Sequence, residues 1–196
     1  MAKKKTKMID KWKLKKWYKV FAPTMFDHRE LYDVVSTDEK SLVNRVMKVS
    51  LMEILGSASR SAMFTTLKLR ITDVKGNEAE TQVIGHEVSP SYIKTFARRG
   101  KSLIHETVDT KTKDGMDLRL KIIAVTGSRV SENTKRNIRS VIIEQMKKDA
   151  SELSYEALMQ EILYGRFMSK LFSRLKSITK MRKVDIRKTE LKETFA

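Results

Sequence analysis

The feature that most constrains the fold of this sequence is a change in the spacing of its apolar residues near residue 130. Between about residues 31 and 126, apolar side chains mostly recur at every second position, which is the period of a β-strand with one buried face. After residue 131 they recur at every third or fourth position, as in an amphipathic helix. We therefore expect an α+β fold in which a sheet is followed by a C-terminal helical layer.

Residues 67–72 and 81–85 are predicted to pair as a β-hairpin. Apolar and polar residues alternate in both segments, and the turn-forming sequence Lys75-Gly76-Asn77 lies between them. Residues 45–51 alternate in the same way and form a further candidate strand.

A second hairpin is predicted for residues 108–112 and 116–122. Asp114-Gly115 lies between these alternating runs, and this dipeptide favours the tight turns that join antiparallel strands. Because several short strands occur without repeated long helical crossovers, we expect an antiparallel, barrel-like core.

Helices are predicted between the hairpins and after the change of period. The first covers residues 89–100, because a Ser-Pro pair suits its start and a glycine suits its end. The later helices begin near residues 131, 154 and 166. Residues 183–187 alternate apolar and charged side chains and are predicted to form a basic edge strand.

Positive charge is concentrated at the two ends of the chain. The formal net charge is +17, yet residues 1–19 hold nine lysines and one aspartate, and residues 164–196 hold ten basic and three acidic residues. Residues 20–163 are therefore almost neutral. This segregation favours binding of both ends to a polyanion. Solvated tails without a partner are the alternative.

The N-terminal segment mixes lysines with large apolar side chains. Both tryptophans, Trp12 and Trp17, lie here together with Tyr18. Since lysines neutralise phosphates and aromatic rings stack on unpaired bases, this mixture indicates RNA contact. In a structural alternative, Trp17, Val20 and Phe21 hold the segment against the core.

These patterns divide the chain into three parts. Residues 1–22 are a basic, aromatic arm, residues 23–130 are the β core with one inserted helix, and residues 131–196 are a helical part that ends in a basic strand. We expect RNA to be bound by basic and aromatic side chains of the arm and of the remaining basic surface. They are Lys11, Lys13, Lys15, Lys16, Trp17, Tyr18, Lys19, Arg98, Arg99, Arg136, Arg139, Arg166, Lys170, Arg174, Arg182 and Lys183.

The sequence offers little for catalysis. The absence of cysteine excludes disulfides, thiolate nucleophiles and cysteine-ligated zinc. The three histidines lack the spacing of ligand pairs and are interpreted as surface or turn residues, and the seven glycines form no phosphate-binding loop. Asp109, Asp114 and Asp117 leave a metal-dependent nuclease open as an alternative. We expect no enzyme activity, no cofactor and no metal.

Targeting and membrane signals are also absent. No apolar run approaches the roughly 18–20 residues that cross a bilayer, and the N-terminus continues into lysines instead of an apolar signal segment. Residues 166–176 are the only segment suited to an anionic lipid surface, and their apolar side is expected to pack on the protein. We therefore expect a cytoplasmic protein without a membrane partner.

Three segments match motifs of a known family. Residues 15–26 read KKWYKVFAPTMF, residues 42–54 read LVNRVMKVSLMEI, and residues 108–120 read VDTKTKDGMDLRL. In this order they resemble motifs of the archaeal and eukaryotic small-subunit ribosomal protein family S-one-e, also called S-three-A-e. The family has Gly where this chain has Asn44 and Asp where it has Glu53. Asn tolerates a left-handed backbone better than most residues.

The resemblance runs from about residue 10 to 190 and implies a structural protein of the small ribosomal subunit, without catalysis, on the platform near the mRNA exit side. The implied partners are 16S rRNA, neighbouring small-subunit proteins, mRNA and initiation factors. The chain ends soon after Ile186, without the long extension of eukaryotic members, so it resembles the archaeal type. A free RNA-binding regulator outside the ribosome is the alternative function.

Overall fold

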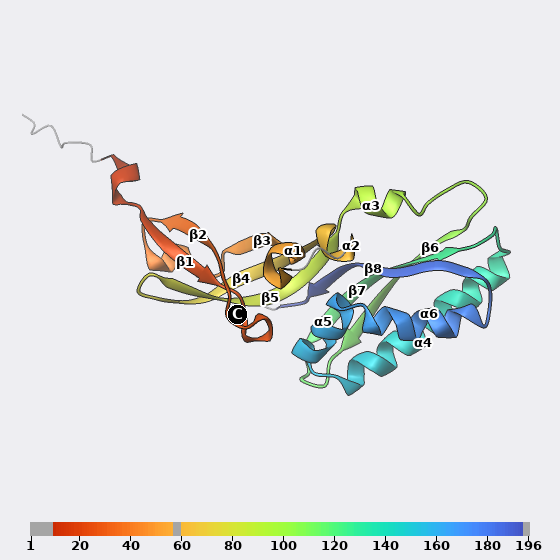
Figure 1. Cartoon of the computed structure of the whole chain (residues 1–196). Coiled ribbons are helices and arrows are strands. Elements are labelled where there is room, and N and C mark those ends of the chain that lie inside the picture. The colour runs from red at the N-terminus through yellow and green to blue at the C-terminus, as the bar shows by residue number, and fades with distance from the viewer. Residues whose placement is uncertain (1–9, 57–59, 194–196) are drawn as a thin grey trace, which may run out of the picture. The chain divides into compact units, whose positions relative to one another are not determined.

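A computed structural model describes residues 10–56 and 60–193, without the side chains of Lys11, Arg60 and Ser61. The chain divides into two compact units (Figure 1). Unit 1 comprises Met1–Lys48 and Leu69–Val83, and unit 2 comprises Val49–Lys68 and Ile84–Ala196. Three strands, β3 (Val46–Ser50), β4 (Thr65–Lys75) and β5 (Glu78–Val88), have residues in both units.

Unit 1 is built on the pairing of β1 with β2 and β5. Its other elements are η1 (Lys11–Leu14), β1 (Lys16–Phe21), η2 (Thr24–Phe26), β2 (Glu30–Ser36) and η3 (Glu39–Ser41). The β1–β2 pair is antiparallel, whereas β1 runs parallel to the first part of β5. Because side chains alternate along a strand, Tyr18 and Val20 of β1 point into a core with Leu42, Ile71 and Ala79.

Unit 2 contains a sheet in which β8 lies between β5 and β7, and β6 lies beside β7. Its strands β6 and β7 form the second hairpin, with Leu103 opposite Val125 and Lys111 opposite Asp117. The remaining elements are α1 (Leu51–Leu55), α2 (Arg60–Met63), α3 (Pro90–Lys94), β6 (Leu103–Lys111), β7 (Asp117–Thr126), α4 (Glu132–Glu152), α5 (Tyr155–Leu163), α6 (Arg166–Lys176) and β8 (Met181–Leu191).

Helices α4, α5 and α6 cover one face of the unit 2 sheet (Figure 1). Helix α4 buries Ile138, Ile142 and Met146, which recur at helical spacing, and α6 buries Phe167 and Leu171. Helix α3 lies on the opposite face, which we call the open face.

The predicted mixture of a sheet and a helical layer is confirmed, but barrel-like closure is not. Across the described strands the sheet is open, since β2 and β6 are the two ends of its path. It is also mixed instead of antiparallel, because β1 and β5 pair in parallel. The long intervening chain makes such a pairing possible, and no local sequence pattern predicts it.

Most predicted elements are confirmed, and two are corrected. The hairpins, the strand at residues 46–50 and the helices that begin after residues 131, 154 and 165 are present. Helix α3 ends at Lys94, so it is shorter than predicted. Strand β8 is not an edge strand, because it pairs with β7 on one side and with β5 on the other.

Candidate nucleic-acid interface

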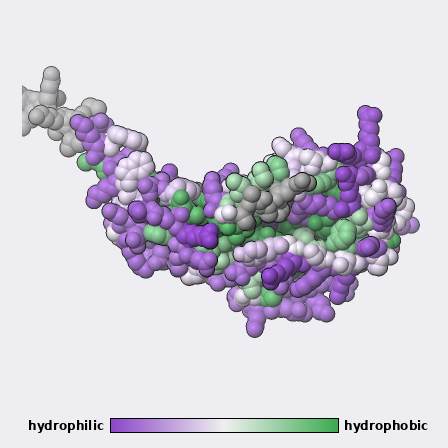
Figure 2. Space-filling view, viewed as in Figure 1, coloured by the Kyte–Doolittle hydropathy of each residue, from purple (hydrophilic) through white to green (hydrophobic). Residues whose placement is uncertain are grey.

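The N-terminal surface of unit 1 begins at η1. Asp10 caps this turn by accepting a hydrogen bond of 3.0 Å from the Trp12 backbone N–H. The Trp12 side chain is 64% exposed, and the Nζ of Lys15 lies 4.1 Å from the centroid of its ring. The two side chains thus form a cation–π contact that leaves most of the indole accessible. In Figure 2 the surface of this segment, at upper left, mixes hydrophilic and pale residues.

Strand β1 continues this surface, and its two neighbouring aromatic residues point to opposite faces of the strand. Trp17 is 63% exposed, whereas Tyr18 is only 2% exposed because it points into the core of unit 1. The prediction named both as RNA contacts, and only the Trp17 ring is accessible for stacking. We use the name N-terminal surface for Trp12, Lys13, Lys15, Lys16 and Trp17.

The lysines of this segment differ in their partners. Lys13, Lys15 and Lys16 are exposed, and none of the three forms an ion pair in the described part of the chain. Lys19 is paired with Glu30 at 2.8 Å, and this hydrogen bond raises the pKa of Lys19. The predicted contact Lys11 has a side chain that lies outside the described residues.

Helix α6 presents a row of cations on its exposed side, which we call the α6 row. Arg166, Lys170 and Arg174 are four residues apart and exposed, opposite the buried Phe167 and Leu171. Lys170 is held 3.3 Å from Glu161.

The two α4 arginines predicted to bind RNA also differ in whether a carboxylate holds them. Arg136 is exposed, and Arg139 is half-buried with its Nε 3.7 Å from Glu106 of β6. Arg139 therefore joins α4 to the sheet.

A further group of cations lies where α3 leads into β6. Arg98, Arg99 and Arg182 are exposed, as predicted for a basic surface. Partial burial, followed by the nearby Arg182 and Arg98, lowers the pKa of Lys101. Lys101 was not singled out from the sequence, although it directly follows Arg98-Arg99-Gly100 and extends that basic run.

Lys183 is not part of the freely exposed surface. Its Nζ lies 3.1 Å from Asp185 and donates a hydrogen bond of 2.7 Å to the Tyr92 hydroxyl. The same nitrogen lies 4.4 Å from the Tyr92 ring centroid and 4.3 Å from that of Phe96. The charge of Lys183 is therefore used inside unit 2.

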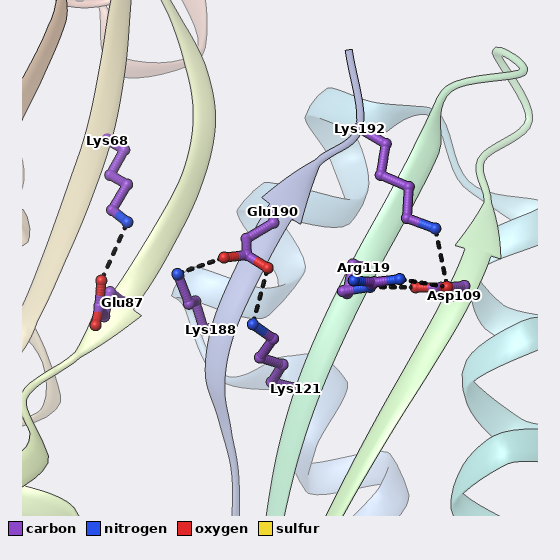
Figure 3. Close-up of polar contacts among 8 residues, drawn as sticks. All are labelled: Lys68, Glu87, Asp109, Arg119, Lys121, Lys188, Glu190 and Lys192. Carbon is purple, nitrogen blue, oxygen red and sulfur yellow. Dashed lines mark hydrogen bonds and ion pairs between the residues drawn. The ribbon is translucent and has the colours of Figure 1, made fainter. Parts of the chain in front are cut away.

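The open face of unit 2 carries cations that are neutralised by carboxylates (Figure 3). Glu190 is bonded to Lys188 and lies 2.9 Å from Lys121, and these hydrogen bonds, that of Lys188 first, lower the pKa of Glu190 to about 2. Lys68 pairs with Glu87 at 3.1 Å in the same way. Such cations are poorly placed for phosphate, because each already has an anion.

The three aspartates considered for a nuclease point to separate structural partners. Asp109 accepts bonds of 2.8 and 3.0 Å from Arg119, which together with Lys192 hold the pKa of its carboxyl well below the usual range. Asp117 lies 3.6 Å from Lys111, and Asp114 accepts a bond from the backbone of α5. Among the described residues, no three His, Cys, Asp or Glu side chains converge on a possible metal position.

The histidines are only partly surface residues. His28 and His105 are exposed, but His86 is 3% exposed, so its interpretation as a surface or turn residue is wrong. Its ring lies 2.9 Å from the Thr189 hydroxyl and 3.3 Å from the Ile186 carbonyl oxygen. Burial lowers the pKa of His86 to about 4, so the ring packs as a neutral group.

Within the described residues, no helix combines the length and the apolar character needed to span a membrane. The described residues thus combine exposed cations, internal ion pairs and separated aspartates.

Comparisons with known proteins identify the class and then the family. A relative from Staphylothermus marinus named small ribosomal subunit protein eS1 is 37% identical over 97% of this chain and 89% of its own length. Proteins of the same name from Sulfurisphaera tokodaii and Saccharolobus islandicus are 35% and 32% identical, over 95% and 93% of this chain and 96% and 86% of their own lengths. The chain is thus a ribosomal protein, a structural component and not an enzyme. The Ribosomal S3Ae family model matches residues 3–194, and the chain belongs to this family, with relatives of the archaeal type.

Proposed function

We propose that this protein binds 16S rRNA in the small ribosomal subunit of the cytoplasmic ribosome, and that it does so through cations that have no carboxylate partner among the described residues. The observation that carries the proposal is the N-terminal surface, where Lys13, Lys15 and Lys16 stand beside two indoles that are more than 60% exposed. Unpaired lysines gain most from a phosphate, since no carboxylate has to be displaced.

The two kinds of side chain divide the work. Lysines bind the RNA backbone and release counterions, which makes affinity depend steeply on salt. Trp12 and Trp17 supply flat apolar rings on which unpaired bases stack, and this adds affinity with little sequence preference. Arg166 and Arg174 of the α6 row and Arg136 add further contacts to the RNA phosphates.

The place of the protein in the subunit is part of the proposal. The names of the relatives support assembly into the small subunit. The family resemblance supports a position on the platform near the mRNA exit side, next to other small-subunit proteins and within reach of mRNA and initiation factors.

The test compares the salt dependence of rRNA binding between matched variants of the full chain. Changing Lys13, Lys15 and Lys16 to Gln should lower the slope of log affinity against log salt by about 2 to 3 units, since each lost phosphate contact removes about 0.7 to 0.9. The control changes Lys75, Lys111 and Lys135 to Gln. These lysines are each paired with a carboxylate at 2.9, 3.6 and 2.6 Å. Equal slopes for the two variants would remove the N-terminal surface from the interface.

A second measurement separates the ribosomal role from that of a free regulator. Sedimentation of cell extract should place the protein with the small subunit, and the Lys-to-Gln variant of the N-terminal surface should be depleted from that fraction. A wild-type protein found only at the top of the gradient would contradict the proposal and favour a regulator outside the ribosome.

A further inference from the structure

The segment between α3 and β6 is fixed at its first end by stacked aromatic rings. Phe64 and Tyr92 stack with ring centroids 4.6 Å apart, and Tyr92 meets Phe96 edge-on at 4.7 Å. The Ser89 backbone N–H also donates a bond of 2.8 Å to the Phe64 carbonyl oxygen. These contacts hold α3 against the open face of unit 2.

Lys183 of β8 locks this aromatic group to the sheet. Its ammonium contacts both the Tyr92 and Phe96 rings and bonds the Tyr92 hydroxyl, while Asp185 balances its charge. A lysine held by two rings, a hydroxyl and a carboxylate has lost much of its freedom, and it is only half-exposed. It is therefore suited to fix Phe96 in place.

The second end of the segment is fixed at Ser102. This residue is 6% exposed; its backbone N–H donates a bond of 3.0 Å to the Thr126 hydroxyl, and its carbonyl oxygen accepts one of 3.0 Å from the Thr126 backbone N–H. Between the two fixed ends, the Lys101 N–H bonds the Arg98 carbonyl oxygen at 3.3 Å. The turn that carries Arg98 and Lys101 is therefore anchored on both sides.

The strand register brings Arg182 to the same place. Ser102 bonds Thr126 of β7, and Thr126 lies opposite Met181 of β8, directly before Arg182. Because neighbouring strands are about 4.8 Å apart, the backbones of residues 102 and 181 are separated by roughly 10 Å. Arginine and lysine side chains span that distance. The lowered pKa of Lys101 agrees with this proximity.

We propose that Arg98, Lys101 and Arg182, named here the α3-turn cluster, form a pre-organised site for the phosphodiester backbone of RNA, and that Lys183 is a positioning residue that holds this site without touching RNA. The inference rests on the proposed rRNA binding and assigns it a specific site in unit 2. In the described residues, no carboxylate pairs with the cluster, so an incoming phosphate relieves the repulsion among its three charges. Since the turn is already ordered, little conformational entropy is lost on binding.

The first experiment uses the full chain, a 16S rRNA transcript and a random-sequence RNA of equal length. Changing Arg98, Lys101 and Arg182 to Gln should weaken 16S rRNA binding by about tenfold or more at about 0.15 M salt and lower the salt slope by about 2 to 3 units. The matched control is again Lys75, Lys111 and Lys135 to Gln, which removes the same charge. If wild type prefers 16S rRNA but both triple variants bind alike, the α3-turn cluster is not a site. If wild type shows no preference for 16S rRNA, the proposed function itself fails.

The second experiment tests Lys183 by a double-mutant cycle. Lys183→Met should weaken RNA binding severalfold in the wild-type background and have no effect when the α3-turn cluster is already changed to Gln, because its role passes through that cluster. Lys183→Arg should restore binding, since a guanidinium also packs on aromatic rings. Equal losses in both backgrounds would show that Lys183 contacts RNA directly and would overturn its positioning role. Far-ultraviolet circular dichroism of every variant verifies folding.

Discussion

At the residue scale, His86 shows how burial sets the charge of a side chain. Its ring is buried on β5 and bonded to Thr189 of β8, and the pKa falls to about 4 because burial outweighs the hydrogen bond to the Ile186 carbonyl and the nearby Asp185 and Glu87. Gly85 explains the close approach of the two strands. A Cβ at this position would lie 2.2 Å from the Thr189 carbonyl oxygen. Glycine is required here to let β8 pack beside His86.

The first prediction concerns the stability of the protein in acid. Because the folded pKa of His86 lies below its ordinary value of 6.5, the unfolded chain binds the proton first. The contribution of neutral His86 is therefore complete above pH 6.5 and is lost as pH falls toward 4. The free energy of unfolding should drop by roughly 3 kcal/mol from this group over that interval. Urea unfolding at successive pH values measures it.

The control for this prediction is His86→Gln, which keeps a hydrogen-bonding group beside Thr189 but does not titrate. Its free energy of unfolding should fall less steeply between pH 6.5 and 4 than that of the wild type. Parallel curves for the two proteins would mean that His86 is not the group responsible.

The second prediction concerns Asn44, whose backbone is left-handed. Asn44 has a φ of 68°, in the left-handed region, and its N–H donates a bond of 2.9 Å to the Ile71 carbonyl oxygen. Asn44→Gly should therefore be tolerated, whereas Asn44→Ala should lower the free energy of unfolding by about 1 kcal/mol. Thermal unfolding of the two variants checks this. An alanine variant as stable as the glycine variant would show that the turn relaxes.

At the scale of elements, α5 depends on a residue from another part of the sequence. Ser154 occupies its N-cap position but makes no capping bond with its side chain. Instead, Asp114, in the turn between β6 and β7, accepts a bond of 2.7 Å from the Tyr155 backbone N–H. A carboxylate at this position also interacts favourably with the helix dipole.

The third prediction concerns Asp114, which supplies the capping acceptor that Ser154 does not. Asp114→Ala should lower the free energy of unfolding by about 1 kcal/mol, the usual cost of losing an N-cap acceptor. Ser154→Ala should change it by only a few tenths of a kcal/mol, since no capping bond is lost. Denaturant unfolding of both variants measures the difference. A larger loss for Ser154→Ala than for Asp114→Ala would contradict this assignment.

Elements were predictable where local chemistry decides them. The Asp-Gly turn, the helix starts after Ser131 and Ser154 and the alternation of β7 all rest on neighbouring residues. The position of β8 was not predictable in this way, because a central strand and an edge strand share the same alternation when one face carries charges. The charged residues within 183–187 suggested an edge, yet β8 is a central strand with β5 on one side and β7 on the other.

The cations of the candidate interface could be listed from the sequence, but their partners inside the protein could not. Charge counts locate the basic segments, but they do not reveal which cations already have a partner. Lys183 meets Tyr92 across 91 positions of sequence, and Lys121 meets Glu190 across β7 and β8. Those partners come from the fold. A cation with such a partner is used inside the protein, and a cation without one is available to RNA.

At the scale of the whole molecule, the net charge of +17 overstates the charge that RNA can use. The ion pairs of the open face neutralise many cations of unit 2, whereas the N-terminal surface and most of the α6 row keep theirs. The salt dependence of binding should therefore follow the unpaired cations instead of the total.

The last prediction uses this distinction. Changing Arg166 and Arg174 of the α6 row to Gln should lower the salt slope of rRNA binding by about 1 to 2 units, whereas Lys170→Gln should lower it less, because Lys170 shares its charge with Glu161. The N-terminal surface belongs to the other unit and shares no partner with α6 among the described residues, so the effects of the two sets should add when one rRNA contacts both. Filter binding across a salt series measures each slope. A third variant combines the substitutions of both surfaces. If its salt slope were no lower than the lower of the two separate slopes, RNA would occupy only one surface at a time.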